Sequence, residues 1–399
     1  MTLTRFALAA GLALTLAAPA AAQDAPASSC LPQAAFAIPS YTSVEQLPDG
    51  RVTFRLCAPE ASDVRVTSND MDPWVPAGFA PGTERGLAMT KDASGLWSAT
   101  TALPVPADNY RYNFQIDGVK VPDPMATTYS RERVGVNSTV DVQGDAGAFQ
   151  TWHADVPHGT VSRIDYWSEP LGARRSAYVY TPPGYMNGTQ RYPVLYLVHG
   201  AGDSADSWTE VGHANNIIDN LIAAGRAQPM IVVMPFGHTP QRPDVPLTGL
   251  LANGDFGADL HQALIPYVDS QFRTLADADH RAMAGLSMGG SHTIRFGLTR
   301  PDVFSRLGIF SMGLGMQPTD VPEYIAANDA ALRRSAQELD LVYYAMGRDD
   351  FLYGTVAPTR AMLDQYHIAH HYNETDGGHT WINWRRYLAD FVPRLNWSN

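Results

Sequence analysis

Short apolar runs alternate with longer amphipathic stretches from residue 151 to the carboxyl terminus, and this alternation restricts the fold more than any other feature of the sequence. The run Tyr192–Val198 is almost entirely apolar, as in strands that are buried on both faces of a sheet. Strands separated by helices are typical of a parallel sheet with crossover helices. Residues 151–399 therefore predict an α/β domain. The predicted strands are Arg175–Thr181, Tyr192–Val198, Pro229–Met234, His280–Gly285, Leu307–Phe310, Leu339–Met346 and His370–Glu374, and the predicted helices are Ala214–Ala224, Asp259–Phe272, Gly290–Thr299 and Thr355–Tyr366.

Residues 36–143 have a different pattern, in which short alternating segments are separated by turn residues. Asp117-Gly118 is a two-residue hairpin signal directly after the longest of these segments. Such a pattern predicts a small all-β, immunoglobulin-like sandwich in front of the α/β domain. A joint rich in Gly, Asp and Ala at Gly144–Gly147 separates the two. The predicted strands are Val52–Leu56, Val64–Val66, Leu96–Thr100 and Tyr110–Ile116.

The first 22 residues predict a cleaved signal peptide. Arg5 precedes the apolar run Phe6–Leu16, and small residues follow up to Ala22. Residues 23–35 are expected to form a linker, and the mature protein is expected to be secreted or periplasmic. Cys30 and Cys57 are the two cysteines of the chain. An oxidising compartment permits a disulfide between them, but the sequence leaves open whether it forms.

The composition excludes several classes of partner. The formal charge is −12 and no block of lysine or arginine interrupts it, so nucleic acid and anionic membrane surfaces are not expected to bind. No later apolar segment is long enough to span a bilayer. A neutral or sugar-borne ligand fits better. No cofactor is expected, and the sequence does not determine the oligomeric state.

A serine lies between two glycines where a predicted strand gives way to a predicted helix. The segment Met283–Gly290 contains Gly285-Leu286-Ser287-Met288-Gly289, which is the nucleophile-elbow pattern. The turn is too tight for side chains at the flanking positions, and the helix amino terminus beyond it favours developing negative charge. The sequence therefore predicts Ser287 as a nucleophile.

A serine nucleophile needs a base that is oriented by an acid, and the expected chain order is Ser, Asp, His. Asp349 and Asp350 both follow the predicted strand Leu339–Met346, and either carboxylate fits the acid. His379 lies on a glycine-rich loop after the last predicted strand and is the predicted base. His367, His370 and His371 offer a metal-binding spacing, but no carboxylate or cysteine motif converges on them, so no metal site is predicted.

Two backbone amides are expected to stabilise the oxyanion of the reaction. Met288 follows the nucleophile and supplies the first amide. The second is expected from the turn that follows Tyr192–Val198, where the amide of Ala201 is favoured and His199 is expected to be structural.

The α/β part resembles the esterase D family. The resemblance rests on the segments Arg174–Arg175, Val179–Tyr185, Pro193–Gly200, Arg281–Gly290 and Gly377–Trp381. It implies an α/β-hydrolase fold, with the catalytic serine, aspartate and histidine of the family on Ser287, Asp350 and His379, and so favours Asp350 over Asp349.

The leading part resembles family-48 carbohydrate-binding modules. The similar segments are Val52–Pro59, Gly95–Trp97 and Tyr110–Phe114 followed by Asp123-Pro124. Modules of this kind can stack sugars on aromatic rings, but Trp97 and Tyr112 are expected to fill the core instead. An esterase D domain behind such a sandwich and a signal peptide resembles bacterial feruloyl esterases, which act on xylan.

These resemblances imply release of ferulic or related hydroxycinnamic acids from feruloylated xylan. Acetylated xylan and a siderophore ester are the alternative substrates. A carbohydrate-binding protein with a relic hydrolase domain would lack a triad member, and none is missing. The Pro- and Gly-rich segment Phe236–Gly254 is expected to wall the pocket. Trp208, Trp381 and Trp384 are candidates for stacking a phenolic ring, with core packing as the alternative.

Overall fold

The computed structural model describes residues 29–32, 34, 37–78, 82–240 and 254–397. The predicted signal peptide, most of the predicted linker 23–35 and most of the segment Phe236–Gly254 lie outside these residues. Among the described residues, no helix is both long enough and apolar enough to cross a membrane.

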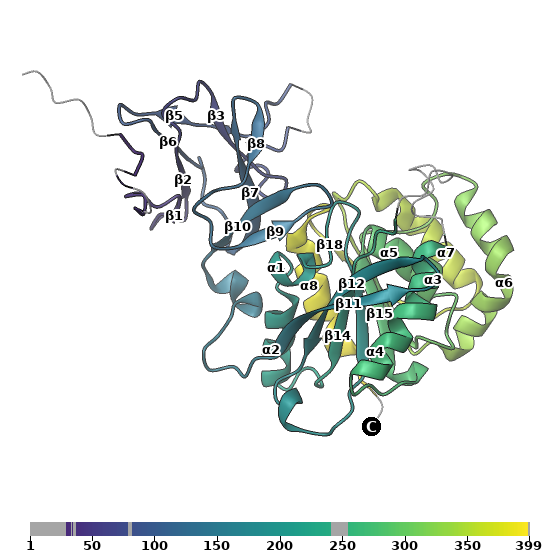
Figure 1. Cartoon of the computed structure of the whole chain (residues 1–399). Helices are drawn as coiled ribbons and strands as arrows, with labels where there is room; N and C mark the ends of the chain where they lie inside the picture. The colour runs from purple at the N-terminus through teal and green to yellow at the C-terminus, as the bar shows by residue number, and fades with distance from the viewer. Residues whose placement is uncertain (1–28, 33, 35–36, 79–81, 241–253, 398–399) are drawn as a thin grey trace, which may run out of the picture.

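The leading part of the chain contains two antiparallel sheets that enclose a core of their own (Figure 1). The first sheet has the order β1-β2-β6-β5. The second has the order β4-β3-β7-β10-β9, and β8 pairs with β7. The bounds are β1 Val44–Gln46, β2 Val52–Cys57, β3 Val64–Thr67, β4 Leu87–Ala88, β5 Thr90–Lys91, β6 Leu96–Thr100, β7 Asp108–Ile116, β8 Val119–Val121, β9 Tyr129–Arg131 and β10 Val136–Val142. All four strands predicted in this part are confirmed, and the strands that the sequence missed have at most seven residues.

Two local predictions in the sandwich are confirmed. Asp117 and Gly118 have φ values of 47° and 87° and join β7 to β8 in an antiparallel hairpin, as expected for a turn with two left-handed residues. Trp97 and Tyr112 are 6% and 1% exposed, so they fill the core. Cys30 and Cys57 form a disulfide, which settles the question that the sequence left open.

The second part of the chain is built on an eight-stranded mixed sheet with the order β11-β12-β14-β13-β15-β16-β17-β18. The strand β12 pairs antiparallel with β11 and β14, and all other neighbours are parallel. The bounds are β11 Thr160–Ser168, β12 Ala173–Thr181, β13 Val194–Val198, β14 Ile231–Pro235, β15 Arg281–Leu286, β16 Arg306–Phe310, β17 Leu341–Gly347 and β18 His371–Thr375. Seven of these strands were predicted. The sequence missed β11, an edge strand whose residues are mostly exposed or half-buried.

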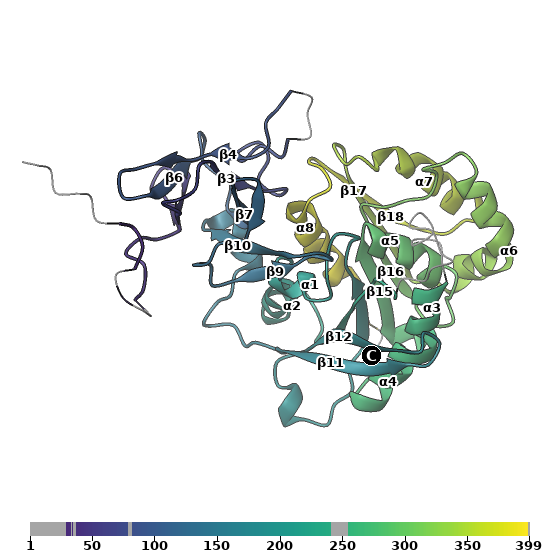
Figure 2. The ribbon, with the colours of Figure 1, turned by 45° about the horizontal axis from the view of Figure 1, so that its top comes forward.

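Helices cover both faces of this sheet. In Figures 1 and 2, α2 and α8 lie on the side of the sandwich, and α3, α4, α5, α6 and α7 lie on the other side. The bounds are α1 Ser207–Glu210, α2 Ala214–Ala223, α3 Asp255–Asp259, α4 Ile265–Gln271, α5 Met288–His292, α6 Asp320–Glu338, α7 Val356–Gln365 and α8 Trp381–Phe391, with π-helical turns at Leu260–Leu264 and Thr293–Gly297. The long helix α6 was not predicted, because it buries three side chains only, Tyr324, Leu332 and Ser335, and so lacks a marked apolar stripe.

The continuous apolar runs are explained by this layering. Successive side chains of a strand point to opposite faces, so a strand covered on both faces must be apolar at every position. In β13, Val194, Tyr196 and Val198 belong to one hydrophobic cluster, and Leu195 and Leu197 belong to the other. The observed sheet thus fits the α/β-hydrolase arrangement that the sequence predicted.

The sandwich packs against the second part of the chain through buried polar contacts. Arg385 of α8 is fully buried and forms an ion pair with Asp108 at the start of β7. Its guanidinium also donates to the carbonyl oxygens of Asn109 at 2.8 Å and Val211 at 2.6 Å. Because a buried charge without a partner is costly, this arginine ties α8 to the sandwich.

Candidate active site

Ser287 lies in the sharp turn between β15 and α5. Its φ of 51° and ψ of −115° are unusual for a residue other than glycine, and its side chain is partly exposed at this turn. A Cβ atom on Gly289 would lie 2.2 Å from the carbonyl oxygen of Val198, and one on Gly285 would lie 2.4 Å from the carbonyl carbon of Gly289. Close backbone contact therefore explains why glycine is needed on both sides of the serine.

Asp350 and His379 are brought together at the carboxyl ends of β17 and β18. The Nδ1 atom of His379 lies 2.9 Å and 3.0 Å from the two carboxylate oxygens of Asp350. The amide of Leu352 also donates to this carboxylate at 2.9 Å, and Asp350 is 4% exposed. Asp349 is exposed and only its backbone amide is fixed, by the carbonyl oxygen of Gly377. The geometry thus places Asp350, and not Asp349, beside the histidine.

The loop that carries His379 is held by the helix after it. The Nδ2 atom of Asn383 in α8 donates to the carbonyl oxygens of Asp376 at 3.1 Å and Gly378 at 2.9 Å. The imidazole packs edge-on against Trp384, with the ring centroids 5.0 Å apart. Since Nδ1 faces Asp350, Nε2 is the nitrogen available to exchange a proton with a substrate or a serine.

The turn after β13 passes beside the serine. A Cβ atom on Gly200 would lie 3.6 Å from the Cβ atom of Ser287. His199 is buried, its Nδ1 lies 2.8 Å from the carbonyl oxygen of Gly200, and its Nε2 accepts a hydrogen bond from the amide of Gly237 at 2.9 Å. Burial lowers the pKa of His199 to about 4, so the ring is neutral and fixes the turn. These contacts fit the structural role expected for His199.

The two predicted oxyanion donors are the residue after Ser287 and the residue after Gly200. Met288 is the first residue of α5, so its amide points away from the helix at the amino terminus. Ala201 follows Gly200 in the turn and is exposed. The segments that carry the two predicted donors thus adjoin Ser287.

His292 is engaged in buried contacts of its own. His292 is buried behind the elbow, stacks on Phe256 with the ring centroids 4.2 Å apart, and its Nε2 lies 3.2 Å from the carbonyl oxygen of Gly237. Burial lowers the pKa of His292 to about 3. Within the described ranges, no group of three histidine, cysteine, aspartate or glutamate residues could hold a metal ion.

The three tryptophans that were candidates for stacking a phenolic ring are buried. Trp208 and Trp381 are fully buried and contact each other edge to face at 5.0 Å, and Trp384 is 5% exposed. Core packing is therefore the correct alternative. Phe351 was not among the predicted residues; it is 76% exposed, and its ring centroid lies 4.5 Å from that of His379. An apolar residue directly after the predicted acid, on a loop at the site, was a signal that could have found it.

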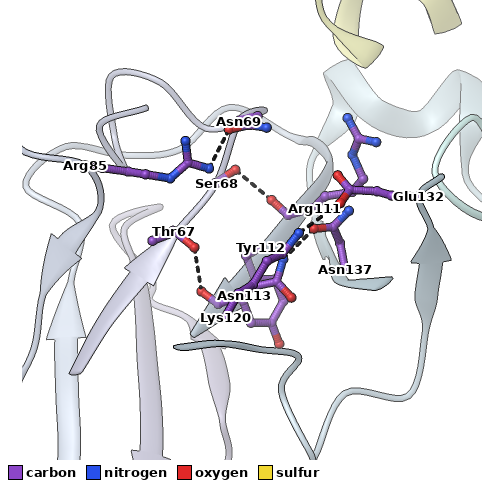
Figure 3. A pocket seen from close by; sticks show the side chains of 10 residues that line it. All are labelled: Thr67, Ser68, Asn69, Arg85, Arg111, Tyr112, Asn113, Lys120, Glu132 and Asn137. Carbon is purple, nitrogen blue, oxygen red and sulfur yellow. Dashed lines mark hydrogen bonds and ion pairs between the residues drawn. The ribbon is translucent and has the colours of Figure 1, made fainter. Parts of the chain in front are cut away.

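A polar hollow lies in the sandwich (Figure 3). Tyr112 is the only aromatic residue in its lining and is buried. The hollow thus offers hydrogen-bonding groups but no exposed ring for a sugar to stack on. Its lining residues are Thr67, Ser68, Asn69, Arg85, Arg111, Tyr112, Asn113, Lys120, Glu132 and Asn137.

Comparisons with known proteins found esterases that are similar to this chain. A protein of Xylanibacter ruminicola named endo-1,4-beta-xylanase/feruloyl esterase is 32% identical over 351 residues, which are 87% of this chain and 45% of that protein. The chain spans less than half of the length of the curated relatives it matches. The solved structure of a ferulic acid esterase is 25% identical, covers 60% of this chain and 98% of its own, and has a TM-score of 0.52.

The enterochelin esterase of Shigella flexneri shares the fold with a TM-score of 0.61 at 17% identity. The match covers 88% of this chain and 94% of that one, a share too large to be confined to residues 151–399. A family model described as putative esterase matches residues 168–395, which is more than half of the chain. The chain therefore belongs to the esterase family, a family of carboxylic ester hydrolases.

Proposed function

We propose that this protein releases ferulic or related hydroxycinnamic acids from feruloylated xylan through a Ser-His-Asp acyl-enzyme mechanism. The observation that carries the proposal is the contact of His379 with the buried Asp350, at the same carboxyl edge of the parallel strands as the elbow that presents Ser287. Support for the substrate comes from the similarity to a protein named endo-1,4-beta-xylanase/feruloyl esterase, over most of this chain.

In the first half of the reaction, Ser287 Oγ attacks the carbonyl carbon of the ester while Nε2 of His379 takes its proton. The amides of Met288 and Ala201 stabilise the oxyanion. The bond to the sugar oxygen then breaks, and His379 gives the proton to that oxygen. Asp350 keeps Nδ1 of the imidazole protonated and stabilises the cation that forms.

In the second half, water attacks the acyl-enzyme and passes a proton to His379, which returns it to Ser287 Oγ as the carboxylic acid leaves. All the groups used are side chains and amides of this chain, so the mechanism needs no cofactor. Phe351 offers an exposed ring beside His379, which suits an aromatic acyl group better than acetate.

Hydrolysis of a siderophore ester is the second candidate. The similarity of the enterochelin esterase to both parts of this chain favours this second candidate. At 17% identity, that similarity shows the fold alone. Acetylated xylan is the remaining alternative and would need no aromatic ring at the site. We propose further that the two domains span 36–143 and 151–399, and that the protein is secreted or periplasmic after cleavage of residues 1–22. The disulfide supports an oxidising compartment.

The test compares ferulate release from feruloylated arabinoxylan oligosaccharides with acetate release from acetylated xylan, for the wild type and for Ser287→Ala. The proposal expects ferulate release by the wild type and a loss of at least about a thousandfold in the variant, with unchanged thermal unfolding. Acetate release alone would keep the mechanism and change the substrate. Equal turnover by the variant would refute the mechanism, and hydrolysis of enterobactin alone would favour the second candidate.

A further inference from the structure

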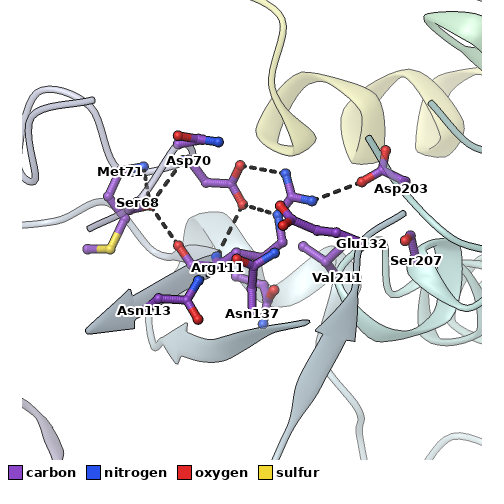
Figure 4. Close-up of polar contacts among 12 residues, drawn as sticks. Ser68, Asp70, Met71, Arg111, Asn113, Glu132, Asn137, Asp203, Ser207 and Val211 are labelled. Carbon is purple, nitrogen blue, oxygen red and sulfur yellow. Dashed lines mark hydrogen bonds and ion pairs between the residues drawn. The ribbon is translucent and has the colours of Figure 1, made fainter. Parts of the chain in front are cut away.

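Arg111 of the sandwich strand β7 reaches across to the catalytic part of the chain and forms an ion pair with Asp203 (Figure 4). Its Nη1 lies 2.9 Å from Oδ1 of Asp203, and its Nε lies 2.8 Å from Oδ2 of Asp70 in the sandwich. The side chains of Arg111, Asp70 and Asp203 are 13%, 3% and 7% exposed. The guanidinium therefore joins a carboxylate of each part of the chain, largely away from solvent.

Asp203 belongs to the turn that carries the proposed oxyanion donor. Its amide donates to the carbonyl oxygen of Gly200 at 3.1 Å, which closes the turn around Ala201. The carboxylate of Asp203 also lies against Gly200, since a Cβ atom on Gly200 would be 3.0 Å from Oδ2 of Asp203. A movement of Asp203 would thus move the backbone next to Ser287.

The hairpin between β9 and β10 makes a second connection to this turn. The amide of Arg133 donates to the carbonyl oxygen of Gly202 at 2.9 Å, and Glu132 forms an antiparallel bridge with Asp203. Just beyond the turn, Ser207 Oγ donates to the carbonyl oxygen of Arg131 at 3.2 Å. Backbone and side-chain contacts from the sandwich therefore hold the same turn from one side.

The electrostatics of Asp203 depend on Arg111. Burial raises the pKa of Asp203, and the guanidinium of Arg111 opposes that rise. Without this cation the buried carboxylate would gain a proton more readily. The side chain of Asp203 would also lose its ion pair with Arg111, which fixes the direction of the carboxylate.

We propose that Arg111 is a positioning residue for catalysis, which acts through Asp203 to hold the amide of Ala201 at the oxyanion. The sandwich is then a part of the catalytic apparatus, and not a module that only carries the enzyme to its substrate. This inference rests on the proposed ester hydrolysis, because Ala201 stabilises an oxyanion only in that reaction.

The test uses 4-nitrophenyl acetate, a small ester that needs no contact with a polysaccharide, and the full chain carrying Arg111→Gln. Loss of one oxyanion donor costs about 100- to 1,000-fold in turnover, so misplacement of one donor is expected to lower kcat about 10- to 100-fold with KM within about threefold. Arg111→Lys is expected to recover only part of the loss, since an ammonium cannot span both carboxylates as the planar fork does.

A second measurement separates positioning from simple loss of folded protein. Phenylboronic acid forms a tetrahedral adduct with a reactive serine, whereas ferulate binds as a planar product. Binding of the boronic acid is expected to weaken by the same factor as kcat, and binding of ferulate is expected to stay within about threefold of the wild type. Asp203→Asn, which keeps the shape of the turn, is expected to show the same pattern if Arg111→Gln fails to fold.

Arg55→Gln is the matched control, because Arg55 is also an ion-paired arginine of the sandwich. Its partner is Glu45, and both residues lie in the sheet that does not contain Arg111. Arg55→Gln is expected to leave kcat unchanged. The inference is overturned if Arg111→Gln and Asp203→Asn fold and keep the wild-type kcat on the small ester, or if they raise only KM for xylan. Absence of Ser287-dependent hydrolysis in the wild type would instead refute the proposed function itself.

Discussion

Replacement of Asp350 by Asn changes one atom in the buried contact that orients His379. In the wild type, Oδ1 of Asp350 accepts from the amide of Leu352 at 2.9 Å, and both carboxylate oxygens lie within 3.0 Å of Nδ1 of His379. In Asp350→Asn the amide oxygen can keep the bond to Leu352, so the loop is expected to stay folded. The new NH2 group then faces Nδ1 of His379 and requires this nitrogen to be unprotonated.

The proton of the imidazole is then on Nε2, the nitrogen that must accept the proton of Ser287. A base in the wrong tautomer costs a serine protease roughly 10⁴-fold in kcat, which is about 5.5 kcal/mol of transition-state stabilisation at about 1.4 kcal/mol per tenfold. We therefore expect Asp350→Asn to lose roughly this factor on a feruloyl ester, with KM within about threefold.

The matched control is Asp349→Asn, because Asp349 is the neighbouring carboxylate and is exposed. It is expected to keep kcat within about twofold of the wild type, since surface substitutions away from special contacts have small effects. Stopped assays on a feruloyl ester and thermal unfolding of all three proteins give the answer. An Asp350→Asn protein that is folded and within tenfold of the wild-type kcat, or an equal loss in Asp349→Asn, would refute the assignment of the acid.

Two further predictions concern the acyl group and acid stability. Phe351→Ala is expected to raise KM for a feruloyl ester about three- to tenfold, which corresponds to the loss of one aromatic contact, because the exposed ring of Phe351 lies beside His379. KM for an acetyl ester is expected to stay unchanged. Equal changes of KM for both esters would contradict a contact between Phe351 and the aromatic acyl group. Burial lowers the pKa of His199 to about 4 and that of His292 to about 3, from the ordinary value of 6.5. Below pH 6.5 the unfolded chain therefore binds protons that the folded chain does not. The free energy of unfolding is therefore expected to be highest above pH 6.5 and to fall by about 3 kcal/mol for each histidine as the pH decreases toward 4. His292→Gln should flatten this dependence of the unfolding free energy on pH. An unfolding free energy that is constant from pH 7 to 5 would contradict the prediction.

The sequence alone predicted those features that depend on neighbouring residues. The glycines around Ser287 identify the elbow, since a tight turn excludes side chains wherever it occurs. Asp117-Gly118 identifies a hairpin, because few residue pairs accept two left-handed conformations. The apolar run of β13 identifies a strand with both faces covered. Patterns of this kind are local, and they predicted the strands of both parts and the nucleophile.

Other features were decided by the tertiary structure alone. Local pattern does not distinguish Asp349 from Asp350, and only the family resemblance favoured Asp350. The direction of the turn after β17 sends the carboxylate of Asp350 to His379 and that of Asp349 to solvent. Trp208 and Trp381 had equal claims on the core and on a ligand until both were seen to be buried. The fate of such side chains depends on what the fold packs against them, which no local pattern contains.

The contact between Arg111 and Asp203 shows the same limit most clearly. The two residues are 92 positions apart, and no motif of the sequence links them. An ion pair of this kind exists only because β7 of the sandwich and the turn after β13 are packed together. The sequence therefore determined which residues could perform the chemistry, whereas the packing of the two parts of the chain decided which residues hold them in place.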